Sequence, residues 1–146
     1  WARRIENEGP LPLFIDYAGR NGLIYDETHL KAIVADVQTL ASIIKTHHNR
    51  PRPQQLAFLQ GLNITPTSVT TTSAYPCEKT LLADVITFQL LKHNRDKADE
   101  LRALNKKVEL SRYYGAYNLP SDIEGAHYVA ARLRDRMEYL DLDAKK

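Results

Sequence analysis

The sequence has only one cysteine, Cys77, so the chain cannot form an internal disulfide, which fits a reducing compartment. It also lacks any run of the roughly 18 apolar residues that a membrane-spanning helix needs. The most apolar segment, residues 81–91, is interrupted by Asp84 and Gln89. We therefore expect a soluble protein without a membrane span, in the cytoplasm or in a virion. No signal peptide is visible in the sequence, and a further segment before Trp1 is compatible with it.

Neither sign of charge dominates, because 20 lysines and arginines face 18 aspartates and glutamates, for a net charge of +2. Without a long basic run, we do not expect a nucleic-acid-binding surface. The histidines form no pair four residues apart, and no cluster of cysteines or carboxylates completes a metal-ligand spacing. We therefore expect neither a metal site nor a cofactor. The five histidines are His29, His47, His48, His93 and His127.

The first 25 residues are rich in glycine and proline, which interrupt helices. Gly9, Pro10, Pro12, Gly19 and Gly22 surround a short apolar patch at residues 13–15. We interpret residues 1–25 as an extended N-terminal arm, which either packs on its own domain or reaches a neighbouring subunit. Residues 26–146 are then a single helical domain, since this length suffices to bury one core.

Four segments have helical patterns. Residues 27–48 carry apolar side chains three and four apart, and Pro51 and Pro53 end that helix. Residues 78–93 are apolar on most sides, as in a central buried helix, and a third helix spans about 95–114. The last begins near Ser121, which with Glu124 makes a capping box. A long loop at 61–76 is of a kind that is often functional. These patterns predict an all-α fold, a compact bundle of four to five helices.

Three of the helix boundaries carry groups that suit a bound phosphate, which needs several fixed donors. Lys45 ends the first helix, Arg52 lies between two prolines, and Arg112 lies near the end of the third helix. The start of the second helix, residues 77–80, offers free backbone amides and the positive end of the helix dipole. We expect Lys45, Arg52 and Arg112 to be phosphate-binding residues.

The same three segments, taken in order, resemble the signature of the type 2 phosphatidic acid phosphatase/vanadium haloperoxidase superfamily. Residues 45–53 fit its K-x6-R-P pattern, residues 73–80 stand where it has Y-P-S-G-H-T, and residues 111–122 stand where it has S-R-x6-H-x3-D. The likeness covers residues 30–133 and is greatest to class A acid phosphatases and related bacterial and phage proteins. It implies a helical, acid phosphatase-like domain at residues 26–146.

The chain departs from this family at the catalytic positions. Asn118 stands where the resemblance places the nucleophilic histidine, and Lys79 where it places the histidine that protonates the leaving group. Cys77 and Glu78 replace a serine and a glycine, while Asp122, which in the family orients the nucleophile, is retained. An amide cannot form a phosphoenzyme, and losing a nucleophile typically costs about 10⁴–10⁶ in turnover. No catalytic set is intact.

These departures favour a catalytically degenerate domain that acts as a structural or binding module, such as a component of a virion or other assembly. We expect protein partners or a homo-oligomer. The alternatives are a phosphomonoesterase in which Cys77 or a water attacks, and a non-hydrolytic binder of phosphate or another anion. Two interpretations of the three cations stay open: they bind an anion, or they pair with Glu78 and Asp122 as a buried ionic network.

Overall fold

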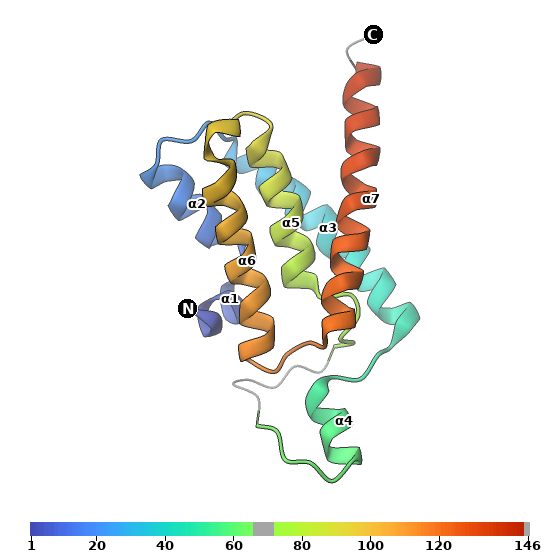
Figure 1. Ribbon diagram of the computed structural model, residues 1–146. Coiled ribbons are helices and arrows are strands. Elements are labelled where there is room, and N and C mark those ends of the chain that lie inside the picture. Colours follow the sequence, from blue (N-terminus) through green and yellow to red (C-terminus); the bar gives the residue numbers. More distant parts are fainter. Residues whose placement is uncertain (66–71, 145–146) are drawn as a thin grey trace.

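The computed structural model describes residues 1–65 and 72–144, with side chains described through residue 137. Within these ranges all regular secondary structure is helical, which confirms the predicted all-α bundle (Figure 1). None of the described helices is long and apolar enough to cross a bilayer. The elements in chain order are α1 (Ala2–Glu8), α2 (Leu11–Arg20), α3 (Glu27–His48), α4 (Pro53–Leu59), α5 (Glu78–Leu91), the 3₁₀ turn η1 (Arg95–Lys97), α6 (Ala98–Tyr114) and α7 (Pro120–Ala144).

Helix α5 is the centre of the bundle, as its nearly uniform apolarity predicts. It packs against α3, α6 and α7, and one face also meets α2. The side chains of Leu81, Leu82, Ile86 and Leu90 are at most 1% exposed. Burying each such side chain stabilises the fold by about 1.5–3 kcal/mol, so this helix anchors the core.

The expected extended conformation of residues 1–25 is wrong. Two helices form there and pack on their own bundle, with Ile5 and Phe14 buried in the same core as α5 and α6. Pro10 and Pro12 stand at the start of α2, where a missing amide hydrogen removes no helical hydrogen bond. Gly9 takes a φ of 76° between the two helices. Glycine and proline thus separate two short helices here instead of preventing them.

The predicted helix over residues 27–48 is confirmed at both ends. Asp26 accepts a hydrogen bond from the amide of His29 at 3.1 Å, and Asn49 ends the helix in the left-handed conformation with a φ of 44°. Helix α4, which follows directly, was not predicted. The 95–114 segment divides into η1 and α6, and α5 ends at Leu91. Part of the predicted loop at 61–76 lies outside the described residues.

The predicted capping box at Ser121 and Glu124 is wrong. Helix α7 already begins at Pro120, so Ser121 lies inside its first turn. The Oδ2 atom of Asp122 accepts a hydrogen bond from the amide of Leu119, the residue before the helix, at 2.8 Å. Proline is pre-organised for the first helical position, which shifts the helix start by one residue and gives the capping role to Asp122.

Candidate functional site

The three sequence segments meet at one end of the bundle. The end of α3, the residues before α4, the approach to α5 and the α6–α7 connection all lie there (Figure 1). Lys45, Arg52 and Arg112 are 7%, 5% and 3% exposed, and we call these three residues the cationic cluster. The prediction placed them together, and the structure brings them within electrostatic reach of one another.

The cluster is electrostatically strained. Burial lowers the pKa of Lys45 to about 8, and the nearby charges of Arg52 and Arg112 act in the same direction. Burial also lowers the pKa of Arg52, again with a contribution from Arg112. Taking three like charges out of water is costly unless their donors find acceptors.

Backbone carbonyls supply many of those acceptors. The Nζ atom of Lys45 donates to the carbonyl oxygen of Ser73 at 2.8 Å. Arg52 donates to the carbonyl oxygens of Thr72 at 3.0 Å and Tyr117 at 2.9 Å, and to the Thr72 hydroxyl at 3.1 Å. The two side chains therefore tie the end of the loop before α5 to α3 and to the α6–α7 connection.

Arg112 has a carboxylate partner that the sequence did not suggest. Its Nη1 atom donates to the Oε2 atom of Glu6, from α1, and its guanidinium lies 4.3 Å from the ring centre of Tyr117. The Glu6 side chain is only 12% exposed. One carboxylate from the N-terminal helix is thus drawn into the cationic cluster.

Asn118 joins two of the three segments. Its side chain is 4% exposed, and its Oδ1 atom accepts a hydrogen bond from Nε of Arg112 at 3.1 Å. Its Nδ2 atom donates to the carbonyl oxygen of Ala74 at 2.8 Å. Both ends of the amide therefore have a partner, and the residue at the predicted nucleophile position lies inside a hydrogen-bond network.

Asp122 is fully buried and pairs with an arginine outside the predicted set. Its Oδ1 atom accepts from Nη1 of Arg50 at 2.9 Å, and the same Arg50 nitrogen donates to the hydroxyl of Ser121. In the described part of the chain, no ion pair within 4.0 Å joins the cluster to Glu78 or Asp122, although the charge of Glu78 acts on Lys45 and that of Asp122 acts on Arg52. The observed pairs are Glu6 with Arg112 and Arg50 with Asp122.

Tyr75 connects Arg50 to the start of α7. The guanidinium of Arg50 lies 4.5 Å from the Tyr75 ring centre, and the ring of His48 lies 4.6 Å from it. A methyl group added at Gly125 would come within 2.1 Å of the Tyr75 ring, so α7 needs a glycine at this contact. The peptide bond from Tyr75 to Pro76 is cis.

The start of α5 carries the other substituted positions. The Cys77 side chain is 1% exposed, and its Sγ atom lies 3.3 Å from the hydroxyl of Thr80. The Cys77 amide donates to the carbonyl oxygen of Asp122 at 3.0 Å, so this amide already has an internal acceptor. Glu78 and Lys79 are half-buried. A buried thiol with a hydroxyl neighbour is typical of a packing residue.

Two partners in this network, Glu6 and Arg50, were missed from the sequence. Arg50 lies inside the 45–53 segment, and its position between Lys45 and Arg52 could have identified it as a residue of the site. Glu6 lies 106 positions before Arg112 and belongs to no motif. Only the packing of α1 against α6 brings it to the site.

Comparison with known proteins gives a fold relationship. No protein-family model matches the sequence, and no curated protein matches it either. The structure is similar to that of a transmembrane PAP2-type phosphatidylglycerolphosphate phosphatase from Bacillus subtilis. The TM-score is 0.61 and the identity 18%, over 91% of this chain and 69% of that one. At this identity the likeness establishes a shared helical fold.

Proposed function

We propose that this chain is a catalytically silent relative of PAP2-type phosphatases that serves as a binding or structural module. The observation that carries the proposal is the environment of Asn118. An amide at the nucleophile position cannot form a covalent phosphoenzyme, and this one is buried with both of its polar atoms bonded to the protein. The network around it supports a framework role.

The alternative of an altered phosphomonoesterase needs a different attacking group. Cys77 was the candidate, but its thiol is 1% exposed and contacts Thr80. Reactive cysteines are partly exposed thiolates, because the thiolate is the nucleophile and substrate must reach it. At the position of the general acid, Lys79 would have to protonate a leaving group from a half-buried place beside Glu78. Neither residue supports turnover.

Hydrolysis of an aryl phosphate between pH 4 and 9 tests the proposal. The comparison includes the natural chain, Arg112→Ala in the cluster, and Arg102→Ala on the exposed surface of the same helix as a matched control. We expect no turnover above buffer in any of them. Turnover in the natural chain and in Arg102→Ala that disappears in Arg112→Ala would overturn the proposal. A variant with Asn118→His and Lys79→His tests whether the cluster supports the chemistry once both histidines are present.

A non-hydrolytic anion site is the second candidate, and the charge balance of the cluster favours it. Glu6 is the carboxylate in direct contact with the three buried cations, Glu78 and Asp122 act on them at longer range, and burial still lowers the pKa of Lys45 to about 8. A bound phosphate would relieve this excess charge. Because binding to the native state raises stability, phosphate should raise the melting temperature more than an equal ionic strength of chloride. Glu6→Gln should tighten that binding, since it removes the competing carboxylate charge.

If the chain is a structural module, it forms part of a larger assembly, such as a virion. That version requires a surface that closes against other copies or against protein partners. Sedimentation velocity of the purified chain over a wide concentration range distinguishes the versions. A defined oligomer supports an assembly component, whereas a monomer at every concentration supports a module that binds something else.

A further inference from the structure

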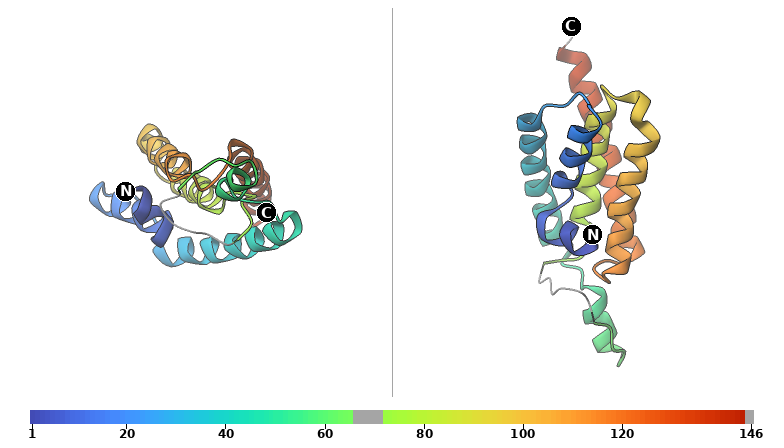
Figure 2. Two further views of the ribbon diagram at one scale, coloured as in Figure 1. Left: turned by 90° about the horizontal axis from the view of Figure 1, so that it is seen from below. Right: turned by 90° about the vertical axis from the view of Figure 1, so that its left-hand side faces the viewer.

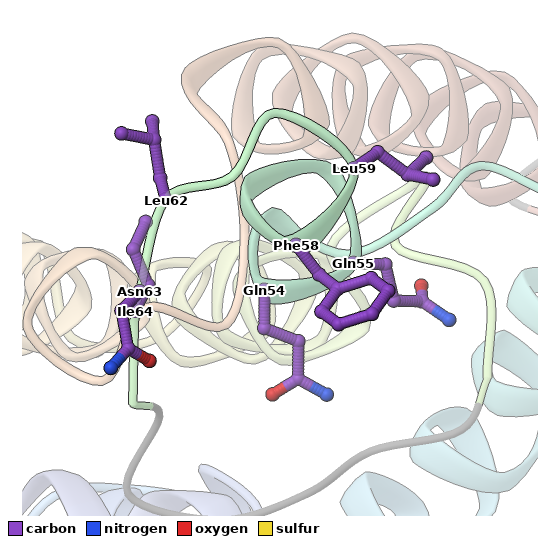
Figure 3. A pocket seen from close by; sticks show the side chains of 7 residues that line it. All are labelled: Gln54, Gln55, Phe58, Leu59, Leu62, Asn63 and Ile64. Carbon is purple, nitrogen blue, oxygen red and sulfur yellow. The ribbon is translucent and has the colours of Figure 1, made fainter.

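Two short helices, α1 and α4, flank the end of the bundle that carries the cationic cluster (Figures 1 and 2). Helix α4 and residues 60–65 project away from the bundle. Figure 3 shows the shallow groove that they form, and the side chains that line it are all neutral. Helix α1 instead packs on α6 and α2 and carries Glu6 into the cluster. Of these two helices, α1 is therefore the one whose charge acts on the buried cations.

Helix α1 is held by few groups. Of its seven residues one, Ile5, is buried. The next helix, α2, buries Phe14 and Ala18 and follows the buried Pro10. Gly9 joins the two helices with a φ of 76°, and no atom outside its chain neighbours lies within 4 Å of the position that a Cβ would take. A rotation at Gly9 can therefore move α1 while α2 stays in the core.

The sequence of α1 gives this helix little stability of its own. Its seven residues are fewer than the roughly 12–15 that an isolated helix needs in water. Arg3 and Arg4 lie near its N-terminal end and Glu6 and Glu8 near its C-terminal end, so their charges oppose the helix dipole. The N-cap residue, Trp1, makes no side-chain cap hydrogen bond in the described structure. Helix α1 therefore depends on its contacts with α6 and α2.

One of these contacts lies where an anion would bind. The Tyr117 ring centre lies 4.3 Å from the guanidinium of Arg112, and Asn118 accepts a hydrogen bond from Nε of Arg112 at 3.1 Å. The Nη1 atom donates to a carboxylate oxygen of Glu6, whose charge also acts on Arg52. Arginine binds carboxylate and phosphate oxygens through the same donors. Glu6 therefore occupies the position of an anionic ligand on Arg112.

We infer that α1 is a built-in competitor for the anion site, and that a phosphate group bound at Arg112 displaces α1 from α6. The inference rests on the anion site proposed above and adds its regulation. With phosphate on Arg112, the Glu6 carboxylate would stand in a largely buried place beside a second anion and without its counter-charge, which is unfavourable. Glu6 directly follows the buried Ile5 in a short helix, so moving its carboxylate into water moves α1 with it.

Binding and displacement are then linked in both directions. Docked α1 lowers the fraction of chains that can bind phosphate, and the apparent affinity falls by that fraction. By the same linkage, phosphate loosens α1 by the factor by which α1 weakens phosphate binding. A change that loosens α1 should therefore tighten phosphate binding even where every charge of the cluster stays in place.

Calorimetric titration with inorganic phosphate tests this link on two variants that loosen α1 in different ways. Glu6→Gln removes the carboxylate charge, whereas Ile5→Ala removes the buried anchor and keeps that charge. We expect each to tighten phosphate binding by about fivefold or more, as is typical of coupling between two sites. The matched controls are Glu8→Gln in the same helix and Leu30→Ala, which is 3% exposed in the same core. Neither control should change the affinity.

Trp1 reports the position of α1 directly. Its ring lies 6.2 Å from that of Tyr114, and the ammonium of Lys107 lies 5.1 Å from its ring centre. It is also the single tryptophan of the sequence, so the fluorescence comes from one place. Phosphate should shift the emission to the red and raise quenching by acrylamide as the ring leaves Tyr114. An equal ionic strength of chloride should change neither.

The outcomes separate this inference from the proposed function. If phosphate bound the natural chain and both variants with one affinity, or left the Trp1 signal unchanged at saturation, the inference would be overturned while the anion site stood. Tighter binding in Glu6→Gln alone would show competition by charge without displacement of α1, and would also overturn it. If phosphate bound none of these chains, the anion site would fail and the inference with it. Aryl phosphate hydrolysis tests catalytic silence separately.

Discussion

The cationic cluster and the α4 tip, which consists of α4 and residues 60–65, lie at the same end of the bundle. The cluster buries charged side chains, whereas the tip exposes apolar ones. The cluster buries three charges and gives their donors carbonyl oxygens, a carboxylate and an amide from its own chain. The tip leaves Phe58 and Leu59 in solvent with little of the bundle against them. Charged side chains whose donors are bonded within the chain indicate a structural role, whereas large apolar side chains left in solvent indicate a binding partner.

The largest expected effect compares two phenylalanines. Phe14 in α2 is fully buried, whereas Phe58 in the α4 tip is 81% exposed. Phe14→Ala should lower the free energy of unfolding by about 3–5 kcal/mol through lost burial and a cavity. Phe58→Ala should change it by less than about 0.5 kcal/mol. Urea unfolding of both variants measures the difference, and equal losses would mean that the tip packs on the bundle.

Asn118 allows the same comparison between a buried and an exposed polar side chain. Asn118→Leu leaves Nε of Arg112 and the carbonyl of Ala74 without this partner in a buried place. We expect a loss of about 2–4 kcal/mol in the free energy of unfolding, since each unsatisfied buried group costs about 1–3 kcal/mol. Asn63→Ala in the exposed tip is the control and should be nearly neutral. A stable Asn118→Leu variant would contradict the framework role.

Two glutamates of α1 allow a matched test of the pair with Arg112. Glu6 is 12% exposed and pairs with Arg112, whereas Glu8 is 51% exposed and pairs with Arg4. Glu6→Gln should cost about 1–3 kcal/mol, because it leaves a largely buried guanidinium without a counter-charge. Glu8→Gln should cost little, since exposed ion pairs contribute little. Thermal unfolding at one pH and salt concentration compares the two.

The cluster also predicts a dependence of stability on pH. The pKa of Lys45 falls from 10.5 to about 8 in the folded chain, so the unfolded chain binds more protons between these values. Stability should therefore rise with pH through this window, relative to Lys45→Met. Urea unfolding at pH 7.5 and 9.5 tests the sign of this change in the free energy of unfolding. A pH dependence shared by Lys45→Met would show that other groups cause it.

A smaller effect of the opposite sign is expected at His127. The hydrogen bond from its Nδ1 to the Oδ2 atom of Asp84, at 2.6 Å, raises the pKa of His127 above 6.5. The stability from this pair is present in full below the unfolded pKa and is lost as pH rises through the raised folded value. The side chain is 42% exposed, so solvent screening keeps the effect small. His127→Gln should flatten the dependence across neutral pH.

The long helices could be predicted from the sequence because their apolar spacing repeats over many turns. Helix α3 matched its predicted range, and α5 was recognised as central from its uniform apolarity. Helices α1 and α2 were missed, since glycine and proline were interpreted as preventing helices when they separate them. The seven-residue α4 is too short to show a clear period.

For the site, the resemblance to the phosphatase signature implied which segments meet but not how their side chains pair. The positions of Lys45, Arg52, Arg112 and Asn118 followed from motif spacing. The acceptors of the two buried cations Lys45 and Arg52 are mostly carbonyl oxygens, which every residue carries and which leave no trace in the sequence. The Glu6 contact depends on helix α1, at residues where the sequence predicted an extended arm.

Hydrolysis of aryl phosphate by the natural chain tests the central claim most directly. With Asn118 held in the framework and the Cys77 thiol buried against Thr80, the predicted rate equals that of buffer at every pH from 4 to 9. A rate clearly above buffer that Arg112→Ala removes, while Arg102→Ala retains it, would contradict the account. The cluster would then be the active site of a phosphatase with different catalytic groups.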